Sequence, residues 1–496
     1  MNGDNTKVIR MAALGDLRQC LELAEEMGEL ERISGADPHL EMGALCELSL
    51  SKFVPPVLLF EDIKGFTAGH RVVANVRSSA LLNPGWGGGL DLVRGYRRGQ
   101  GKAEVPIDPK FVATGPVFEN RMEGDAVDIG TFPAPKWHAD DGGNYIGTEC
   151  MVIMRDPDTG WVNAGTYRLQ VQDHTTLGIM VEPGKHGDII RRKYWARGEI
   201  CPVAITIGQA PVLGAMAATT VPSGVSEFAV AGGRIGRAIK LVEGPVTGLP
   251  FPADAEIAFE GVMPPPDVES RSEGPFGEWP GYYASADRLE PVISVAAAYH
   301  RHDPIITAAP PAKPTYPGTY YGTAGTSLFR AATLWDELEV AGVPGITGVW
   351  KMPGGGSRFI DVIALKQLHA GHAKMAGLVA VGCSAAAFAG RMTVIVDDDI
   401  DITNSAEVMW AMATRWDPKT QTDIIDGTRS GNIDPRVEPD KRASQNLVNS
   451  RIIIYALRPF HWKNDFPKVN AVAKDYAEKI RQKWETKLPF LGVGHG

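Results

Sequence analysis

Hydrophobic and polar residues follow a helical pattern at the start of the chain and then two strand-like runs. Residues 16–33, DLRQCLELAEEMGELERI, are expected to form a helix, because apolar residues recur on one face and Asp16 can cap the first turn. That face carries Leu17, Cys20, Leu21 and Ala24. The runs VPPVLLFEDI and HRVVANV then predict strands, and LDLVRGYRRG predicts a short helix. Residues 1–115 are therefore expected to form an N-terminal α/β domain.

The pattern changes at residue 116 to short alternating runs that stop at Asp, Gly and Pro. Examples are ECMVIMRDP, GWVNAGTYRLQVQ and TTLGIMVEP, and one helical segment, GDIIRRKYWARG, interrupts them. Many short strands separated by turn residues are typical of an antiparallel barrel. Residues 116–308 are therefore expected to form a central β-barrel domain.

Helices and strands alternate again in residues 309–496, which predicts a third, α/β domain. Residues 369–390, HAGHAKMAGLVAVGCSAAAFAG, are expected to form one long, buried helix, and MTVIVDDDIDI a buried strand that ends in acids. The aspartates at 397–399, and the pair His369 and His372, have metal-ligand chemistry, but we favour a structural role for all of them. The tail contains a mixed-charge helix that could dock on a neighbouring subunit.

The chain has 496 residues, of which 44% are hydrophobic and 22% charged, as expected for a globular protein of two or three domains. Its formal net charge of −9 argues against non-specific nucleic-acid binding and against a basic membrane-binding surface. No run of about eighteen apolar residues is present, and MNGDNTKVIR lacks an apolar core, so neither a transmembrane helix nor a secretory signal is expected. Five scattered cysteines without a CxxC motif favour a reduced, cytoplasmic protein.

Three residues of the central segment, Asn163, His186 and Glu227, are of types that can bind a metal through oxygen or nitrogen. Such a mixed set suits Mn²⁺ or Mg²⁺ better than a metal that prefers thiolates. Each residue type alone is more often structural than a ligand, so the spacing leaves both interpretations open. Asn163 and Arg168 are five positions apart, and side chains alternate along a strand. A bulge or turn at Gly165 is therefore needed if both residues are to face one site.

A loop rich in Gly and Pro, ESRSEGPFGEWPGYY, carries Glu273 and Glu278 five positions apart. Near one arginine, two such acids could form an acid–base unit, in which one stays charged while burial keeps the other protonated. The alternative is a solvated loop that carries two unrelated acids.

Taken in order, the motifs N-x-x-x-x-R, K-H-G, S-G-V-S-E, E-G-P-F-G-E-x-P-G-Y, H-A-K and V-D-D-D-I-D resemble those of the UbiD family of decarboxylases, over residues 17–410. The resemblance implies a multidomain fold, α/β and α+β. It would have an N-terminal α/β domain, a central split β-barrel that binds flavin, and a C-terminal α/β oligomerisation domain. It also implies prenylated FMN as cofactor, a flavin prenyltransferase as its supplier, and a homodimer or a hexamer of dimers.

The resemblance further implies roles for individual residues. Asn163, His186 and Glu227 match the ligands of a divalent metal, usually Mn²⁺, that bridges to the cofactor phosphate. Trp161 and Thr219 fall near positions that hold K⁺. The positions that match flavin contacts are Asn163, Ala164, Gly165, Thr166, Tyr167, Arg168, Lys185, His186, Glu227 and Lys374.

Loss of CO₂ from an sp² carbon leaves a carbanion that no side chain stabilises, so a cofactor must act as electron sink. In the family the substrate bonds covalently to the prenylated flavin, by cycloaddition or a simpler adduct, CO₂ leaves, and a proton replaces it. The matching catalytic residues are Arg168, Glu273 and Glu278. Arg168 is expected to hold the substrate carboxylate, Glu278 to deliver the proton and Glu273 to tune both. The chemistry is reversible, so carboxylation stays open.

The expected substrate is an aromatic or heteroaromatic acid, with an α,β-unsaturated acid as the alternative. Its pocket is expected to draw on the PTYPGTYYGT loop, where Tyr316, Tyr320 and Tyr321 could stack on a flat ring, and on the region after Arg429. The alternative is a structural loop of large side chains. Two other functions are a catalytic subunit of a larger carboxylase complex and an FMN-dependent oxidoreductase on a split barrel. The intact Glu-Arg-Glu set argues against an inactive subunit, and AVAGGRIGR does not match the GxGxxG dinucleotide fingerprint.

Overall fold

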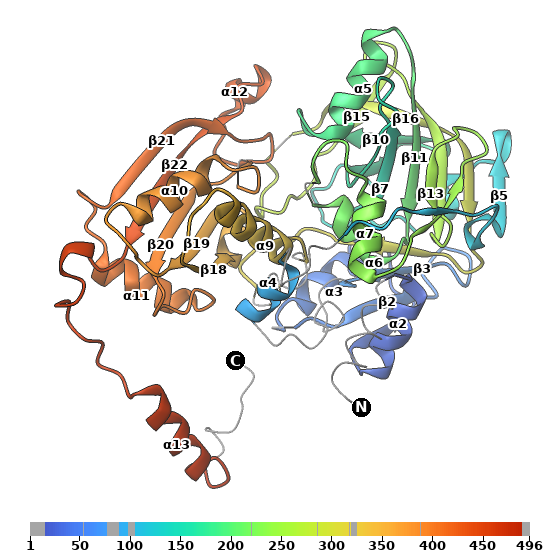
Figure 1. Cartoon of the computed structure of the whole chain (residues 1–496). Coiled ribbons are helices and arrows are strands. Elements are labelled where there is room, and N and C mark those ends of the chain that lie inside the picture. Colours follow the sequence, from blue (N-terminus) through green and yellow to red (C-terminus); the bar gives the residue numbers. More distant parts are fainter. Residues whose placement is uncertain are drawn as a thin grey trace.

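A computed structural model provides the structure of the chain. It describes residues 15–52, 54–76, 89–97, 105–219, 221–284, 286–316, 318, 325–386 and 388–488. The described strands form four sheets. Figure 1 shows the N-terminal sheet (blue) below the large central sheet (green to yellow), with the C-terminal sheet (orange) beside them. The predicted multidomain α/β and α+β fold is confirmed.

The first helix, α2 (Leu17–Glu26), begins where the sequence predicts. The Asp16 side chain accepts a hydrogen bond from the backbone N–H of Gln19, and the predicted apolar face is buried. The helix is shorter than the predicted 16–33, because Gly28 adopts a φ of +70° and turns the chain. The residues that follow, Leu30–Ser34, form strand β1.

The N-terminal sheet has the strand order β1-β2-β3-β17. Its remaining elements are β2 (Val57–Glu61), β3 (Arg71–Ala74), β17 (Ile305–Ala308) and helix α3 (Glu41–Ser49). Strand β17 follows the whole central sheet in the chain but pairs in parallel with β3. Likewise β4 (Lys110–Phe111) pairs with β12 (Lys240–Glu243). The predicted domain limits stay predictions. The two pairings just described join strands from opposite sides of the limit expected between residues 115 and 116.

The central sheet runs in the order β6-β9-β10-β16-β14-β11-β7-β8, and β5 and β15 also pair with β16. Its strands are β5 (Asn120–Glu123), β6 (Tyr145–Gly147), β7 (Cys150–Arg155), β8 (Val162–Gly165), β9 (Arg168–Val171), β10 (Thr176–Met180), β11 (Cys201–Ile207), β14 (Ile257–Met263), β15 (Ser270–Glu273) and β16 (Arg288–His300). Because β6 and β8 end this path without pairing with each other among the described strands, the barrel is open on one side.

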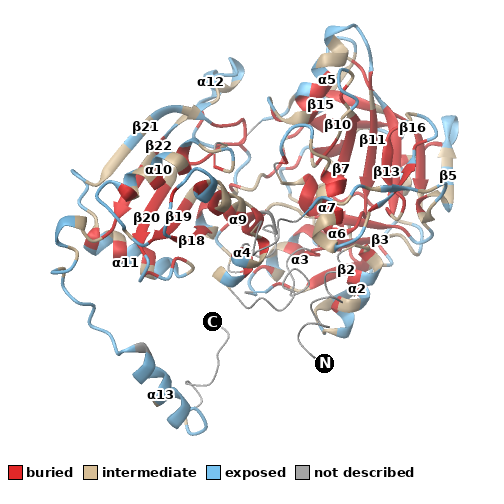
Figure 2. Ribbon diagram, viewed as in Figure 1, coloured by how far each residue is buried: buried red, intermediate tan, exposed pale blue. Residues whose placement is uncertain are grey.

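Smaller elements flank the central sheet. They are helices α5 (His186–Ala196), α6 (Pro211–Ala217) and α7 (Glu227–Ile235), and strand β13 (Pro250–Pro252), which pairs with β12. Figure 2 shows that buried residues line the strands of the central sheet. Strands β7, β10, β11 and β14 are buried at nearly every position. The two faces of β7, β11 and β14 pack into two different hydrophobic clusters.

The C-terminal sheet has the strand order β18-β19-β20-β22-β21, with three parallel strands in the middle and an antiparallel strand at each edge. Its strands are β18 (Ile346–Lys351), β19 (Ile360–Leu365), β20 (Met392–Asp397), β21 (Thr422–Arg429) and β22 (Val448–Ala456). The helices are α9 (Gly325–Val340), α10 (His372–Gly382), α11 (Ser405–Arg415), α12 (Pro439–Ala443) and α13 (Lys474–Trp484). This arrangement agrees with the predicted third α/β domain.

Helix α10 is half as long as predicted for residues 369–390. It starts after Gly371, which adopts a left-handed conformation, and ends at Gly382 because Cys383 is extended. An alanine-rich composition favours a helix but does not by itself mark where the helix stops.

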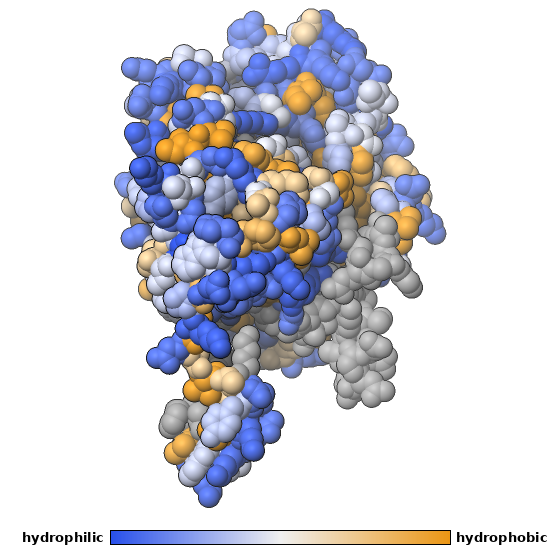
Figure 3. Space-filling view, turned by 60° about the vertical axis from the view of Figure 1, so that its left-hand side comes forward, coloured by the Kyte–Doolittle hydropathy of each residue, from blue (hydrophilic) through white to orange (hydrophobic). Residues whose placement is uncertain are grey.

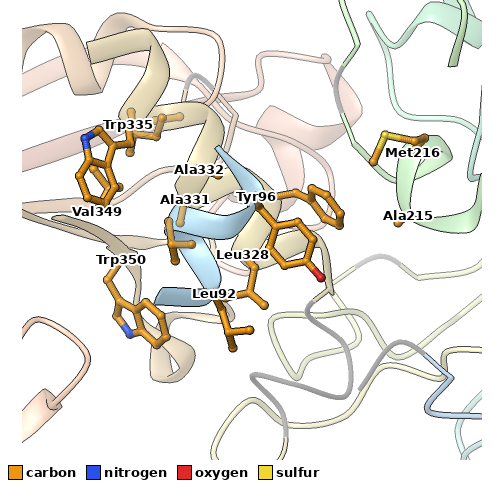
Figure 4. Close-up of a cluster of buried hydrophobic side chains, with 14 of the residues drawn as sticks. Leu92, Tyr96, Ala215, Met216, Leu328, Ala331, Ala332, Trp335, Val349 and Trp350 are labelled. Carbon is orange, nitrogen blue, oxygen red and sulfur yellow. The ribbon is translucent and has the colours of Figure 1, made fainter. Parts of the chain in front are cut away.

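Helix α4 (Leu90–Tyr96) belongs to the N-terminal part of the chain but packs on α9 and β18 of the C-terminal domain. Figure 4 shows Leu92 and Tyr96 pointing toward Leu328 of α9, with Trp350 of β18 nearby. The ring of Tyr96 lies 4.3 Å from that of Phe329, between centroids. Each such buried side chain contributes about 1.5–3 kcal/mol relative to exposure. The same hydrophobic cluster also includes Ala215 and Met216 of α6, so apolar packing continues from the C-terminal domain to the central domain.

The C-terminal tail, with helix α13, extends away from the three sheets (Figure 1). In Figure 3 it extends below the body and carries both hydrophobic and hydrophilic side chains. Its large apolar residues Val472, Tyr476 and Trp484 are exposed. The expected docking of this helix on a neighbouring subunit stays a prediction. Among the described residues, no helix is long and apolar enough to cross a membrane.

Candidate active site

A cavity of about 470 Å³ lies between the central sheet and the C-terminal domain and collects most of the predicted site residues. This volume suits a small-molecule site. The predicted residues that line it are Asn163, Gly165, Thr166, Tyr167, Arg168, Lys185, His186, Thr219, Glu227 and Glu278. The C-terminal domain adds Arg330, Arg358, Ser384, Phe388, Arg429 and Ile433.

Strands β8 and β9 bring Asn163 and Arg168 to the same cavity. Strand β8 ends at Gly165 and β9 starts at Arg168, so the predicted turn after Gly165 is confirmed. A Cβ atom on Gly165 would lie 2.6 Å from the hydroxyl of Tyr167, which leaves no room for a larger residue. The hydroxyl of Tyr167 accepts a hydrogen bond from the N–H of Gly187 at 3.0 Å, which ties this turn to the start of α5.

Arg168 lies between Glu273 and Glu278. Its Nε and Nη2 donate to the two carboxylate oxygens of Glu273 at 2.7 and 2.6 Å, and its Nη1 donates to Glu278. Tyr145 donates from its hydroxyl to Glu273 at 3.2 Å. The side chain of Glu273 is 0% exposed and that of Arg168 is 8% exposed. These acids are buried partners of one arginine, and the alternative of a solvated loop is wrong.

Burial raises the pKa of Glu278, although the neighbouring Arg168 opposes the shift. Burial also works against the charge of Arg168, but the two glutamates more than offset it and raise the pKa of the guanidinium. The site therefore combines a permanent cation with a carboxyl group that holds its proton more firmly than an exposed glutamate does. This is the combination that general acid catalysis needs near neutral pH.

Asn163, His186 and Glu227 lie together at another part of the cavity wall. Asn163 donates from Nδ2 to Glu227 at 2.8 Å, and Glu227 also accepts from the N–H of Ala164 at 3.2 Å. His186 and Glu227 are the first residues of α5 and α7, so both side chains start at helix N-termini. Strand β8, which carries Asn163, and the starts of helices α5 and α7 thus bring three segments of the chain together.

The same three residues suit a divalent cation. The Oδ1 atom of Asn163 is buried without a hydrogen-bond partner, so it is free to be a ligand. Burial and the charge of Lys185 lower the pKa of His186, which favours the neutral imidazole that binds metals. Burial raises the pKa of Glu227 to about 7, and a bound cation would favour its ionised form. Because no group of three His, Cys, Asp or Glu in the described part of the chain could hold a metal, a cation bound here would also need the amide oxygen of Asn163.

The residues expected near K⁺ are engaged with the protein. Trp161 donates from its indole to the carbonyl of Val225 at 3.1 Å, and its ring meets that of His186 edge-on. Thr219 donates from its hydroxyl to the carbonyl of Ala215 at 2.7 Å, and it lines the cavity. Trp161 does not line the cavity. The K⁺ site stays a prediction.

Four cations line the cavity without an ion pair in the part of the chain that the structure describes. They are Lys185, Arg330, Arg358 and Arg429. Burial and these arginines lower the pKa of Lys185 to about 7, and burial lowers the pKa of Arg330 to about 10. Arg358 stacks over the ring of Trp279 at 4.5 Å, and Arg330 donates to the carbonyl of Ala218 at 3.4 Å. Lys185, Arg330 and Arg358 are partly buried and Arg429 is exposed. Unpaired cations around a cavity suit an anionic ligand.

Comparison with known proteins identifies the family and the fold of the chain. The chain matches the N-terminal domain of 3-octaprenyl-4-hydroxybenzoate carboxy-lyase over residues 21–80, its Rift-related domain over 110–314 and its C-terminal domain over 325–456. The chain belongs to the UbiD family. It is therefore a carboxy-lyase of the UbiD decarboxylase class.

Relatives from this family resemble the chain over nearly its whole length. A pyrrole-2-carboxylic acid decarboxylase from Pseudomonas aeruginosa is 29% identical over 509 aligned positions, covering 97% of this chain and 98% of that protein. The vanillic acid decarboxylase of Sedimentibacter hydroxybenzoicus superimposes with a TM-score of 0.81 at 26% identity, covering 95% and 99%. An evolved dimeric form of the UbiD-class enzyme HmfF from Pelotomaculum thermopropionicum, solved in complex with prFMN, gives 0.76 at 28%, covering 93% and 98%.

Some predicted site residues of this UbiD-family chain lie outside the cavity. The side chain of Lys374 is 57% exposed and pairs with Asp423 at 3.0 Å, so the structure does not bring it to the cavity. Ala164 and Glu273 do not line the cavity but form hydrogen bonds with Glu227 and Arg168, which do. Other residues outside the cavity are Tyr316, which donates to Glu47, and Asp397 and Asp399, which pair with Arg415 and Arg458. Tyr320 and Tyr321 lie outside the described residues.

Sequence reasoning missed Glu182, Arg330 and Arg358. Glu182 accepts hydrogen bonds from the backbone and side chain of Asn432 in the C-terminal domain. None of the three lies in one of the motifs, and no local signal marks them. Arg330 lies in α9 and Arg358 in the segment after β18, and only tertiary packing brings these two segments to the cavity. The region after Arg429 reaches the cavity, because Ile433 lines it. The expected part of this region in a substrate pocket stays a prediction.

Proposed function

We propose that this enzyme catalyses the reversible, non-oxidative decarboxylation of an aromatic or heteroaromatic acid with prenylated FMN, and that Glu278 is the proton donor. The observation that carries this proposal is the burial of Arg168 between Glu273 and Glu278 at the wall of the cavity. The names of two relatives, a pyrrole-2-carboxylic acid and a vanillic acid decarboxylase, support a flat ring acid as substrate. An α,β-unsaturated acid remains the second candidate.

The residues present fit the proposed cofactor. Asn163, His186 and Glu227 would hold Mn²⁺ or Mg²⁺ at the flavin phosphate, with Trp161 and Thr219 near a K⁺ ion. The cations that line the cavity would neutralise the negative charge of the phosphate. When bound, prenylated FMN supplies the electron sink that loss of CO₂ from an sp² carbon requires. The complex of HmfF with prFMN supports this assignment.

The protein's own part is to position the acid and to move a proton. Arg168 keeps its charge and binds the substrate carboxylate, while Glu273 holds the guanidinium in place through two hydrogen bonds. Glu278 keeps its proton because it is buried, and it gives that proton to the carbon from which CO₂ has left. The side chains of Phe276, Trp279 and Phe388 at the cavity wall exclude water.

The first test is to co-express the chain with a flavin prenyltransferase and to identify the bound cofactor by mass spectrometry. The loaded enzyme is then screened for CO₂ release from a panel of aromatic, heteroaromatic and acrylic acids. Prenylated FMN and release of CO₂ from a ring acid are expected. Plain FMN with hydride-transfer activity would support an oxidoreductase, and prenylated FMN without turnover would point to a subunit that needs partners. The predicted homodimer or hexamer of dimers can be measured on the same sample by light scattering.

The proton donor is tested by Glu278→Gln, with Glu290→Gln as the matched control. Glu290 is also buried, also paired with an arginine and also has a raised pKa from burial, but it does not line the cavity. Glu278→Gln is expected to lower kcat by about 10²–10⁴-fold with unchanged cofactor content, whereas Glu290→Gln retains activity. Normal turnover in Glu278→Gln would contradict the assignment.

A further inference from the structure

Glu278 stands on a tight turn that no strand supports. Strand β15 ends at Glu273, and the chain then leaves the sheet. Glu278 donates from its backbone N–H to the carbonyl of Tyr282 at 3.1 Å, and Gly281 donates to the carbonyl of Glu278 at 2.8 Å. These two bonds shape the turn but do not attach it to the rest of the protein. Its position relative to Arg168 must therefore depend on contacts from elsewhere.

Asp141 holds both ends of this turn. Its Oδ1 atom accepts one hydrogen bond from the backbone N–H of Gly277 and one from the hydroxyl of Tyr283, both at 3.2 Å. Gly277 is the residue before Glu278, and Tyr283 is the residue after the turn. One carboxylate oxygen thus clamps the two flanks of the segment that carries the proposed proton donor.

Asp141 is itself firmly placed. Its side chain is fully buried, and its second oxygen accepts from the backbone N–H of His138 at 2.9 Å. The next residue, Gly142, donates to the carbonyl of Pro275 at 2.7 Å. A Cβ atom on Gly142 would lie 1.8 Å from the carbonyl oxygen of Gly274, so the two segments are in direct backbone contact. Residues 138–142 therefore form a rigid base for the loop.

We propose that Asp141 is a positioning residue for the decarboxylation, which sets the location of the Glu278 carboxyl against Arg168 by clamping the turn. The proposal rests on the proposed function, in which Glu278 delivers the proton. Asp141 makes no contact with Glu278, so its effect passes through the backbone. A shift of about 1 Å in a catalytic group can lower a rate by roughly 100-fold, and loss of either flank bond would free the turn by this order of distance.

The test compares Asp141→Asn with Asp140→Asn in the cofactor-loaded enzyme. Asparagine has the same shape, but its amide nitrogen accepts no hydrogen bond, so either the turn or His138 loses its acceptor. Asp140 is the exposed neighbour and undergoes the same chemical change. Asp141→Asn is expected to lower kcat by roughly 10- to 100-fold with KM within about twofold, and Asp140→Asn to leave both unchanged. Tyr283→Phe, which removes one of the two flank bonds, is expected to lower kcat by a smaller factor.

Hydrogen–deuterium exchange on the same variants reports the clamp directly. Peptides that cover residues 274–284 are expected to exchange faster in Asp141→Asn than in Asp140→Asn. Faster exchange with normal kcat would reduce Asp141 to a structural role and overturn the proposal, as would unchanged exchange. If wild-type enzyme releases no CO₂ from any acid, the proposed function fails, while the exchange measurement still decides whether Asp141 holds the turn.

Discussion

Arg168→Lys is the substitution that most directly tests how the site works. The planar guanidinium contacts both acids at once, with two bonds to Glu273 at 2.7 and 2.6 Å and one to Glu278. A lysine keeps the positive charge but has a single nitrogen on a flexible stem, so it cannot reproduce this fork. The variant therefore separates the charge of the residue from its geometry.

The size of the effect follows from the bonds lost. A hydrogen bond to a charged group contributes about 1.5–3 kcal/mol, and a buried acceptor left without a partner adds a penalty of similar size. Loss of one fork bond in this buried site should thus cost about 3 kcal/mol of unfolding free energy. For a domain of this size, each 1 kcal/mol shifts Tm by about 2–4 °C, which gives a decrease of roughly 6–12 °C. Turnover should fall by at least about 100-fold, because the substrate carboxylate and Glu278 both lose their position.

Arg415→Lys is the matched control. Arg415 also lies between two acids, with bonds to Asp397 and Asp399 at 2.8–2.9 Å, and its side chain is only 2% exposed. It lies in the C-terminal domain and does not line the cavity. Differential scanning calorimetry of both variants, followed by CO₂ release assays, should show lower Tm in both and lost turnover only in Arg168→Lys. If Arg168→Lys kept more than about a third of wild-type kcat, the fork would not be needed.

Three further predictions concern the proton, the metal and the flavin. Because burial raises the pKa of Glu278 and its protonated form is the active one, kcat should fall as pH rises through that pKa; a limb in the kcat–pH profile near 4.3, the ordinary glutamate value, would refute this. Glu227→Gln should lower the Mn²⁺ content measured by mass spectrometry at least about tenfold, and the exposed Glu243→Gln should not. Lys374→Ala should leave flavin content and turnover unchanged, because Lys374 is exposed and pairs with Asp423; flavin loss measured by absorbance would restore the role that its motif implies.

The order of helices and strands was predictable from the sequence where the pattern is local. Helix α2 and its cap at Asp16 follow from apolar spacing and one side-chain hydrogen bond within the same turn. The ends of helices were less predictable, as the early stops at Gly28 and Gly382 show. Strand partners were least predictable, because the pairing of β17 with β3 joins residues more than 200 positions apart. Such pairings depend on the whole fold rather than on a window of sequence.

Some residues of the candidate site were likewise predictable from local sequence, and others were not. Arg168, Glu273 and Glu278 could be predicted because they lie in two short motifs, and the structure brings all three together. Asp141 and Arg358 lie in no motif that the sequence reasoning used. Their importance comes only from their contacts in the folded chain. Asp141 holds a turn that begins 136 positions further along the chain. Arg358 stacks over the ring of Trp279.

The distribution of charge explains why the cavity is built from two domains. The acid–base residues all come from the central sheet and its loops, whereas Arg330, Arg358 and Arg429 come from the C-terminal domain. These cations have no ion pair in the described part of the chain, and burial lowers the pKa of Arg358 well below its usual range. Holding such charges in a cavity destabilises the protein unless an anion compensates them. The proposed cofactor and substrate are both anions, so their binding would stabilise the contact between the two domains as well as the site itself.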